Sequence, residues 1–267
     1  MVNFEGKTDL GYGRRFNEDY LYMKCLDDNN NKQDYLGMVL DGNGSNLGKN
    51  DDPDMKMMPA TMVAHEIAEI IREIYKDDAD LLWFNPLLVL KQAVLCANKI
   101  LGGFKMGNEE EYGGFSSAIT IFLIHDYTLY YLHAGNTRMY LMRLNKDNTT
   151  KFVQLTKDQT KAQILVDKGL IQGNEYYNNP DRLVLYSGIG VFSNPEFQSG
   201  RLPLQKNDIL LFTTDGIHYA LSQRDLENII INNGNMTKAI DQMINDAIGF
   251  KNIDNMTALM LYINELD

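Results

Sequence analysis

Five acidic side chains stand where rigid segments of the chain are expected to begin or end. Asp41 directly follows an apolar run, Asp215 follows another after one threonine, and Asp254 stands two residues before a third. Glu18 and Asp19 form an acidic pair in an early segment. Mg²⁺ and Mn²⁺ prefer carboxylate oxygens and keep several waters, so a few such groups can hold an ion. Two ions that share a water lower its pKa and neutralise charge on a transferring phosphoryl group. The acidic set therefore predicts a two-ion site for phosphoryl chemistry.

A plainer interpretation of the same residues stays open. Gly42 follows Asp41 and Gly216 follows Asp215, and Asp-Gly after a strand is common turn chemistry. Taken singly, each pair is better explained as a turn than as an ion ligand. Glycine would also let a backbone carbonyl or a substrate approach closely. The functional interpretation therefore depends on the whole set and its order along the chain.

Two hydrophobic patterns indicate the elements that must position these carboxylates. Apolar runs bounded by turn residues predict strands over Tyr35–Leu40, Ala118–Ile124, Thr128–His133, Thr137–Leu144, Asp208–Thr213 and Met256–Ile263. Helical spacing of apolar residues predicts helices over Ala60–Tyr75, Pro86–Leu101, Lys161–Lys168, Gln223–Asn233 and Thr237–Ile248. Because the strands cluster and the helices come in pairs, we expect antiparallel sheets covered by helices, an α+β fold. The longest irregular stretch, Ser45–Met58, does not resemble a linker, so one domain is expected over residues 1–267.

Composition and charge narrow the classes of partner. The net charge of -11 and the pI near 4.8 argue against nucleic acid, which attracts a positive field. The two cysteines, Cys25 and Cys96, cannot form a disulfide framework and suit a reducing compartment, so a cytoplasmic location is expected. The N-terminus has no signal-peptide pattern, and the purest apolar runs are too short to span a membrane.

Short motifs follow one another along nearly the whole chain in the order typical of one enzyme family. The chain resembles the bacterial branch of the type-2C (PPM) metal-dependent protein serine/threonine phosphatases. The matching segments are Gly11 and Arg14 with Asn17–Asp19, Val39–Gly44, Gly114–Ile121, Ala134–Tyr140, Leu155–Gln159, Lys168–Ile171 with Pro180–Leu183, Thr214–Ile217, and Asp254–Thr257. Each match is weak alone, and their joint order carries the resemblance.

The resemblance implies a fold and an activity. The fold is two stacked antiparallel β-sheets with helices on both outer faces, a four-layer α/β/β/α sandwich. The activity is hydrolysis of phosphoserine and phosphothreonine in proteins by a water that bridges two divalent cations, Mn²⁺ or Mg²⁺. No covalent phosphoenzyme is expected. The implied partner is a phosphoprotein, in signalling that opposes a serine/threonine kinase, and the implied state is a monomer.

The resemblance also implies a role for each matching residue. Arg14, four residues before Glu18, would bind the substrate phosphate with its guanidinium fork. The catalytic residues would be Arg14, Asp41 and Asp215. The ion ligands would be Asp41, which bridges both ions, the Gly42 carbonyl, Glu18 on one ion, Asp215 and Asp254 on the other, and Asp19 through a water.

Two positions depart from the family pattern. Asn136 and Tyr219 stand where aspartates help to hold a third, looser ion, and a neutral amide and a phenol are poor ligands for Mg²⁺ or Mn²⁺. A third site is therefore expected to be weak or absent. His218 could serve as a substitute acid or ligand, but a partly exposed structural histidine at the start of a helix is the simpler interpretation.

Two other functions compete with an active protein phosphatase. The departures at Asn136 and Tyr219 keep open a catalytically weak pseudophosphatase, a metal-binding regulatory module with the same fold. A two-metal nuclease or other phosphodiesterase would also use scattered carboxylates, but the acidic charge and the lack of a basic stripe count against it.

Overall fold

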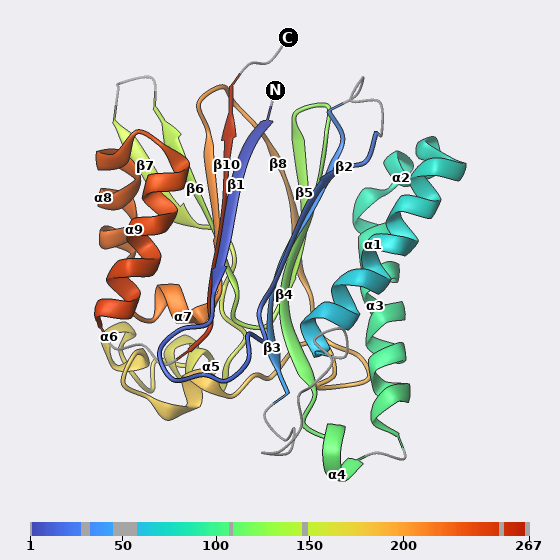
Figure 1. Cartoon of the computed structure of the whole chain (residues 1–267), viewed down its shortest axis with the longest axis horizontal. Helices are drawn as coiled ribbons and strands as arrows, with labels where there is room; N and C mark the ends of the chain where they lie inside the picture. The colour runs from blue at the N-terminus through green and yellow to red at the C-terminus, as the bar shows by residue number, and fades with distance from the viewer. Residues whose placement is uncertain are drawn as a thin grey trace.

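Two five-stranded antiparallel sheets are stacked face to face with helices outside both of them (Figure 1). The computed structural model describes residues 2–27, 33–44, 58–106, 109–145, 149–250 and 254–264. The first sheet contains, in spatial order, β1 (Val2–Asp9), β10 (Met256–Ile263), β9 (Ile209–Thr213), β6 (Arg138–Leu144) and β7 (Thr150–Gln154). The second contains β2 (Tyr20–Cys25), β3 (Tyr35–Asn43), β4 (Ser116–His125), β5 (Thr128–Ala134) and β8 (Gln198–Pro203).

Helices cover the outer face of each sheet, which confirms the predicted four-layer sandwich. Beside the second sheet lie α1 (Pro59–Asp77), α2 (Ala79–Phe84), α3 (Pro86–Lys105) and α4 (Glu109–Tyr112). The first sheet is covered by α8 (Gln223–Asn233) and α9 (Met236–Gly249), with the short α7 (Asp215–His218) at its lower end. A segment between β7 and β8 holds α5 (Lys161–Asp167), α6 (Gly173–Tyr176) and the 3₁₀ helix η2 (Pro180–Leu183).

Side-chain caps set where α3, α8 and α9 begin, whereas α1 begins at Pro59 without one. Asn85 accepts a hydrogen bond from the Leu88 amide (3.2 Å) at the start of α3. Ser222 and Asp225 cap α8 reciprocally, and Asn235 accepts from an amide in the first turn of α9. Each cap satisfies an amide that has no partner within its helix. The starts of these three helices are therefore encoded locally.

The space between the sheets is filled by apolar side chains from both of them. Val39 and Phe122 of one sheet are buried with Phe212 and Leu259 of the other. The Phe122 and Phe212 rings stack with centroids 4.5 Å apart. This layer holds the two sheets together, so it also sets how their ends face each other.

All the predicted strands and helices occur in the structure. The structure also contains more polar strands that the sequence does not predict. β3 and β4 are buried on both faces, which explains why they read as continuous apolar runs. The prediction lacks β1, β2, β7 and β8, whose residues are mostly half-buried or exposed. Residues 45–57 of the irregular stretch before α1 lie outside the described residues.

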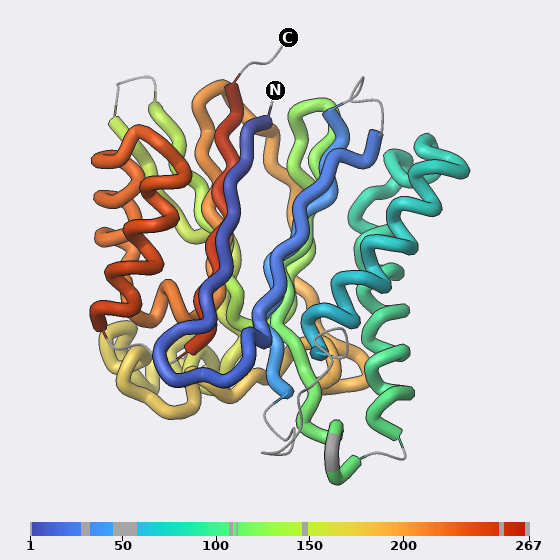
Figure 2. Tube along the Cα trace, viewed as in Figure 1, coloured from blue at the N-terminus to red at the C-terminus, as the bar shows by residue number. Residues whose placement is uncertain are grey.

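The first and last strands lie side by side. β1 pairs with β10 along its whole length, from Val2 opposite Ile263 to Asp9 opposite Met256. Both ends of the chain therefore lie at the same end of the sandwich (Figure 2). The loop after β1 is consequently brought to the opposite end, beside the beginning of β10.

One helix in the described part of the chain, α3, is long and apolar enough to cross a membrane by composition. Its buried residues, among them Leu90, Val94 and Leu101, belong to the core between α1 and the second sheet. A third of its apolar window is buried, and packing in this core accounts for that part of the apolar composition.

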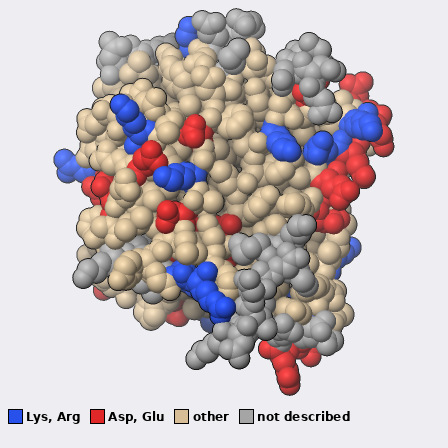
Figure 3. All heavy atoms as spheres, in the orientation of Figure 1, with Lys and Arg blue, Asp and Glu red and all other residues tan. Residues whose placement is uncertain are grey.

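Charged side chains are mixed on the face of the molecule shown in Figure 3. Among the described residues on that face, lysine and arginine are interspersed with aspartate and glutamate rather than gathered in a stripe.

Phe122→Ala tests the inter-sheet layer. Phe122 is fully buried (0% exposed), so the change should lower the free energy of unfolding by about 3–5 kcal/mol through lost burial and a cavity. The matched control is Phe84→Ala, because Phe84 is 89% exposed and its loss should change stability by about 0.5 kcal/mol or less. Urea unfolding measures both; equal effects would contradict the place of Phe122 in the core.

Candidate functional site

The predicted acidic residues meet at one end of the sandwich, where both sheets contribute to a single cleft. Asp41 lies in β3 of one sheet, whereas Asp215 begins α7 after β9 and Asp254 precedes β10 of the other. This is the lower end in Figure 1. The cleft has a volume of about 400 Å³. The candidate residues that line it are Arg14, Glu18, Asp41, Gly42, Asn136, Asp215 and Asp254.

Close backbone approaches bring the carboxylates together. A Cβ atom on Gly42 would lie 2.4 Å from the Glu18 carbonyl oxygen, and one on Gly216 would lie 2.0 Å from the Asn255 carbonyl oxygen. Both distances are too short for any side chain. The glycine after each aspartate is therefore required because it lets Asp41 and Asp215 sit beside the loops that carry the other acidic residues.

Asn255 holds the loop that carries Arg14 and Glu18, a role that the sequence analysis does not assign. Its Oδ1 accepts from the Glu18 amide (2.9 Å), and its Nδ2 donates to the carbonyls of Leu10 (2.8 Å) and Phe16 (3.0 Å). These bonds span more than 230 positions of the chain. Only its place next to Asp254 could have drawn attention to Asn255 in the sequence.

Asp19 lies beneath the cleft, held by two threonine hydroxyls. Thr214, beside β9, and Thr257 of β10 both donate to Asp19 Oδ2, at 2.7 Å and 2.8 Å. Asp19 is 7% exposed and does not line the cleft. This position is compatible with the predicted indirect role, in which Asp19 acts through a water.

Burial and mutual repulsion shift the acidic groups towards their protonated forms. Burial, and then the neighbouring charges of Asp215 and Asp254, raise the pKa of Asp19 to about 8. Burial and the charge of Asp254 raise the pKa of Asp215 to about 7. Burial and three neighbouring aspartates raise the pKa of Asp41 well above its usual range, and burial also raises the pKa of Glu18. Four negative charges cannot coexist here at low cost without a cation.

This donor set fits divalent cations. Its members are hard oxygen donors, and their repulsion is the electrostatic environment that a cation relieves. In the described parts of the chain, no three acidic, histidine or cysteine side chains converge tightly enough to enclose one ion. Each ion would therefore rest on one or two carboxylates, with water completing its ligands, which is the usual arrangement for Mg²⁺.

Arg14 lies in the cleft and contacts two of the predicted ion ligands. Its Nη2 donates to Asp254 Oδ1 at 2.6 Å, and its Nη1 is 3.9 Å from Glu18 Oε2. The Arg14 side chain is 37% exposed. Arg14 and Glu18, four residues apart in the chain, thus line the same cleft.

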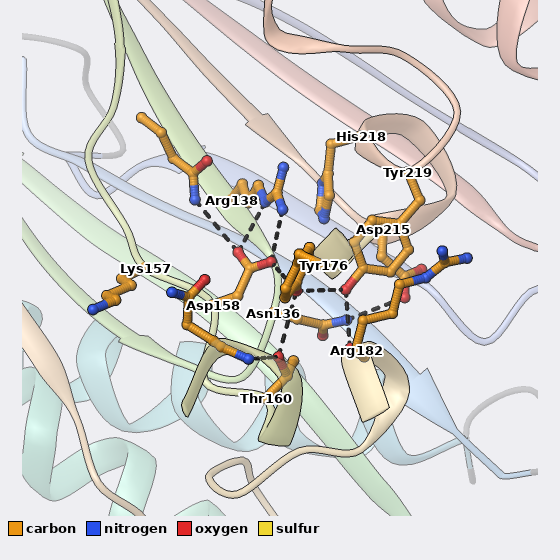
Figure 4. A network of polar contacts seen from close by, with 12 residues as sticks. Asn136, Arg138, Lys157, Asp158, Thr160, Tyr176, Arg182, Asp215, His218 and Tyr219 are labelled. Carbon is orange, nitrogen blue, oxygen red and sulfur yellow. Dashed lines mark hydrogen bonds and ion pairs between the residues drawn. The ribbon is translucent and has the colours of Figure 1, made fainter. Parts of the chain in front are cut away.

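The two departures from the family pattern lie next to Asp215 but face in different directions (Figure 4). Asn136 donates its amide to Asp215 Oδ2 at 3.1 Å. Tyr219 instead turns its hydroxyl to the segment between β7 and β8, donating to the Arg182 carbonyl at 3.0 Å. Burial also raises the pKa of Tyr219, so its hydroxyl stays neutral. Neither residue supplies an anionic oxygen, and the pair does not fit a third cation.

His218 differs from its predicted exposure. It is 1% exposed rather than partly exposed, because α7 packs against the first sheet. Its Nδ1 lies 2.8 Å from the Thr213 hydroxyl oxygen. Burial and the nearby charge of Arg138 lower its pKa well below the usual range. His218 is not among the described residues that line the cleft, which favours the structural interpretation over a substitute acid.

Comparisons with known proteins agree with the fold and the motifs. No family model matches the chain. The protein phosphatase PhpP of Streptococcus pneumoniae serotype 2 is 22% identical over 262 residues, covering 97% of both chains. The serine/threonine phosphatase PstP/Ppp of Mycobacterium tuberculosis has a TM-score of 0.80 at 21% identity and covers 99% of both chains. A PstP catalytic domain solved with 2 manganese ions has a TM-score of 0.75 at 21% identity, with the same coverage. This chain is therefore a distant relative of the bacterial PPM-type phosphatases and has their fold.

Repulsion in the cleft predicts how pH and cations affect stability. The folded-state pKa values of Asp19 and Asp215, about 8 and about 7, lie above the ordinary 3.8. Between pH 3.8 and these values, the folded state therefore binds protons that the unfolded state does not. The stability that these protons contribute is lost as pH rises through the folded-state pKa values. Between about pH 6.5 and about pH 8.5, the melting temperature of the metal-free protein should fall, and Mg²⁺ should raise it more at the higher pH.

Asp41→Asn provides the matched variant for this measurement. Removing one charge from the cluster should stabilise the metal-free protein at about pH 8.5 by about 1–2 kcal/mol and reduce the rise caused by Mg²⁺. Thermal unfolding with a chelator or with Mg²⁺ measures both quantities. A metal-free Asp41→Asn protein that is less stable than the original at high pH would contradict the repulsion.

Proposed function

We propose that this protein is a metal-dependent protein serine/threonine phosphatase that hydrolyses phosphoserine or phosphothreonine. One observation carries the proposal: acidic residues from both sheets converge with Arg14 on one open cleft. Two relatives that match nearly the whole chain are protein phosphatases by name, and the convergence supplies the chemical reason for such an activity here.

The proposed ligands are those predicted from the sequence. Asp41 would bridge two ions with the Gly42 carbonyl beside it, Glu18 would support one ion, and Asp215 and Asp254 would hold the other. When bound, two Mn²⁺ or Mg²⁺ ions would supply an activated water between them as the nucleophile and would neutralise phosphoryl charge. The PstP structure with 2 manganese ions supports this number and type of ion.

The residues of the chain have the tasks of binding and orientation. Arg14 would bind the phosphate, because a guanidinium fork matches two phosphoryl oxygens. Cations that neutralise Asp254 and Glu18 would weaken their hold on Arg14 and leave it free for the substrate. Asp19, fixed by Thr214 and Thr257, would orient a water. Asn136 would keep Asp215 in place.

The proposed partners follow from this activity. The substrates would be phosphoproteins, in cytoplasmic signalling that opposes a serine/threonine kinase. The products of hydrolysis are inorganic phosphate and the free serine or threonine hydroxyl, so the protein would reverse a kinase reaction.

Release of phosphate from a phosphothreonine peptide tests the proposal. Release should require Mn²⁺ or Mg²⁺, and Asp215→Asn should lower kcat by more than about 100-fold, because losing a ligand exceeds the 10–100-fold cost of disturbing a group that supports one. Asp126→Asn is the control: this aspartate is 88% exposed in the β4–β5 turn and lies outside the cleft, so its kcat should match the original.

The other outcomes identify the alternatives. Tight cation binding without release above the Asp215→Asn level would favour a pseudophosphatase. Faster hydrolysis of a phosphodiester than of the phosphopeptide would favour a phosphodiesterase. Release that persists in a chelator would refute the role of the ions.

A further inference from the structure

The segment between β7 and β8 is tied to the first sheet at the position where the family pattern would place a third ion. We call residues 160–186 the flap; it contains α5, α6 and η2. Its two ends are joined, since the Lys161 amide donates to the Val184 carbonyl (2.8 Å) and the Tyr186 amide to the Gln159 carbonyl (2.9 Å). The flap is therefore one closed loop whose position depends on what holds its far side.

A buried ion pair anchors that far side (Figure 4). Arg138 at the start of β6 donates through Nε and Nη2 to both oxygens of Asp158, at 2.8 Å and 2.7 Å. Tyr176 of the flap donates its hydroxyl to Asp158 Oδ2 at 2.5 Å. Both members of the pair are almost fully buried, with side chains 7% and 1% exposed. A bidentate pair in this setting is a rigid anchor.

Tyr219 adds the second connection. Its hydroxyl oxygen lies 3.1 Å from that of Tyr176 and 3.0 Å from the Arg182 carbonyl oxygen. The two tyrosines have two hydroxyl protons for three contacts. Tyr176 donates its proton to Asp158, and Tyr219 donates its proton to the Arg182 carbonyl. The contact between the two hydroxyl oxygens then has no proton of its own. The Arg182 guanidinium lies 4.7 Å from the centroid of the Tyr219 ring, a cation–π distance.

We propose that Tyr219 is a positioning residue that holds the flap in the place of a third ion. An aspartate at this position would need a cation to reach the flap, whereas the tyrosine hydroxyl donates directly to the Arg182 carbonyl of η2. Leu183 of η2 and the next two residues, Val184 and Leu185, form one wall of the cleft. The Tyr219 contact thus fixes the cleft wall without a metal.

Hydrogen exchange in the metal-free protein tests this proposal independently of activity. Tyr219→Phe should speed amide exchange in residues 176–186 about fivefold, the ordinary net effect of one hydrogen bond. Tyr262→Phe is the matched control, since it removes a hydroxyl bonded to Asn207 (2.7 Å) on an exposed part of the first sheet. Exchange in the flap should be unchanged in that control.

Three results would overturn the proposal. One is unchanged flap exchange in Tyr219→Phe. Another is faster exchange throughout the first sheet, which would mean a general loss of stability. The third is a clear slowing of flap exchange in the original protein at high Mn²⁺, which would mean that an ion does hold the flap.

A second inference has a separate basis, the apolar character of the cleft wall, and it rests on the proposed function. Leu183 and Val184 are 58% and 39% exposed, although both line the cleft beside Asp41 and Asp215. Leu185 and Val191 complete this wall. Acidic side chains and this aliphatic wall thus line the same cleft.

We infer that the wall selects phosphopeptides with an apolar residue next to the phosphorylated one. Neighbouring Cα atoms are about 3.8 Å apart, so the residue next to one whose phosphate is bound near Arg14 is within reach of the side chains that line the cleft. The acidic side chains repel an acidic neighbour, while the aliphatic wall gains from covering an apolar one. The occupant that fits this lining is a phosphorylated residue with an aliphatic neighbour.

Two phosphothreonine peptides that differ only in a flanking leucine or aspartate test this inference. The original protein should have a kcat/KM about tenfold higher for the leucine peptide. Leu183→Ser should reduce that ratio by severalfold. Leu81→Ser, which changes a leucine that is 55% exposed on α2 and outside the cleft, should keep it.

The outcomes separate the two ideas. Equal kcat/KM values for the peptides in the original protein, or a ratio unaffected by Leu183→Ser, would overturn the selectivity while the phosphatase stands. Hydrolysis of neither peptide would overturn the proposed function and the selectivity with it.

Discussion

Repulsion among the acidic groups gathered at one end of the sandwich is the constraint on which the rest of the structure depends. Burial raises the pKa of Asp19, Asp41 and Asp215, and the charge of Asp254 raises all three further. A chain free to move would separate them. They stay together because each belongs to a segment held by sheet pairing or by a close backbone approach, and the stability of the whole fold offsets the local cost.

The stacking of the two sheets converts this constraint into a site. Asp41 comes from one sheet, and Asp215 and Asp254 come from the other. The distance between them is therefore set by the apolar layer around Phe122 and Phe212. Asn255 connects the two halves through the loop that carries Glu18. Burial of apolar surface thus positions polar groups that cannot position themselves.

Two neutral residues change the character of this centre relative to the family pattern. Asn136 donates to Asp215 and so removes some of its repulsion. Tyr219 directs its hydroxyl away from the acidic groups and towards the flap. Both substitutions reduce the negative charge that would attract another cation. The same two residues form direct hydrogen bonds in place of ion contacts. The loss of the two carboxylate ligands and the fixed position of the flap therefore have the same physical basis.

The sequence by itself determined the acidic residues, the strands that carry most of them and the longer helices, because apolar periodicity and Asp-Gly pairs are local signals. It also determined the likeness to the PPM-type phosphatases through the order of its motifs. Only the tertiary structure decided that Thr214 and Thr257 hold Asp19, that Asn255 holds the Glu18 loop, that His218 is buried and that Tyr219 faces the flap. These contacts join residues far apart in the chain, and their partners depend on strand register and sheet stacking, which no local pattern encodes.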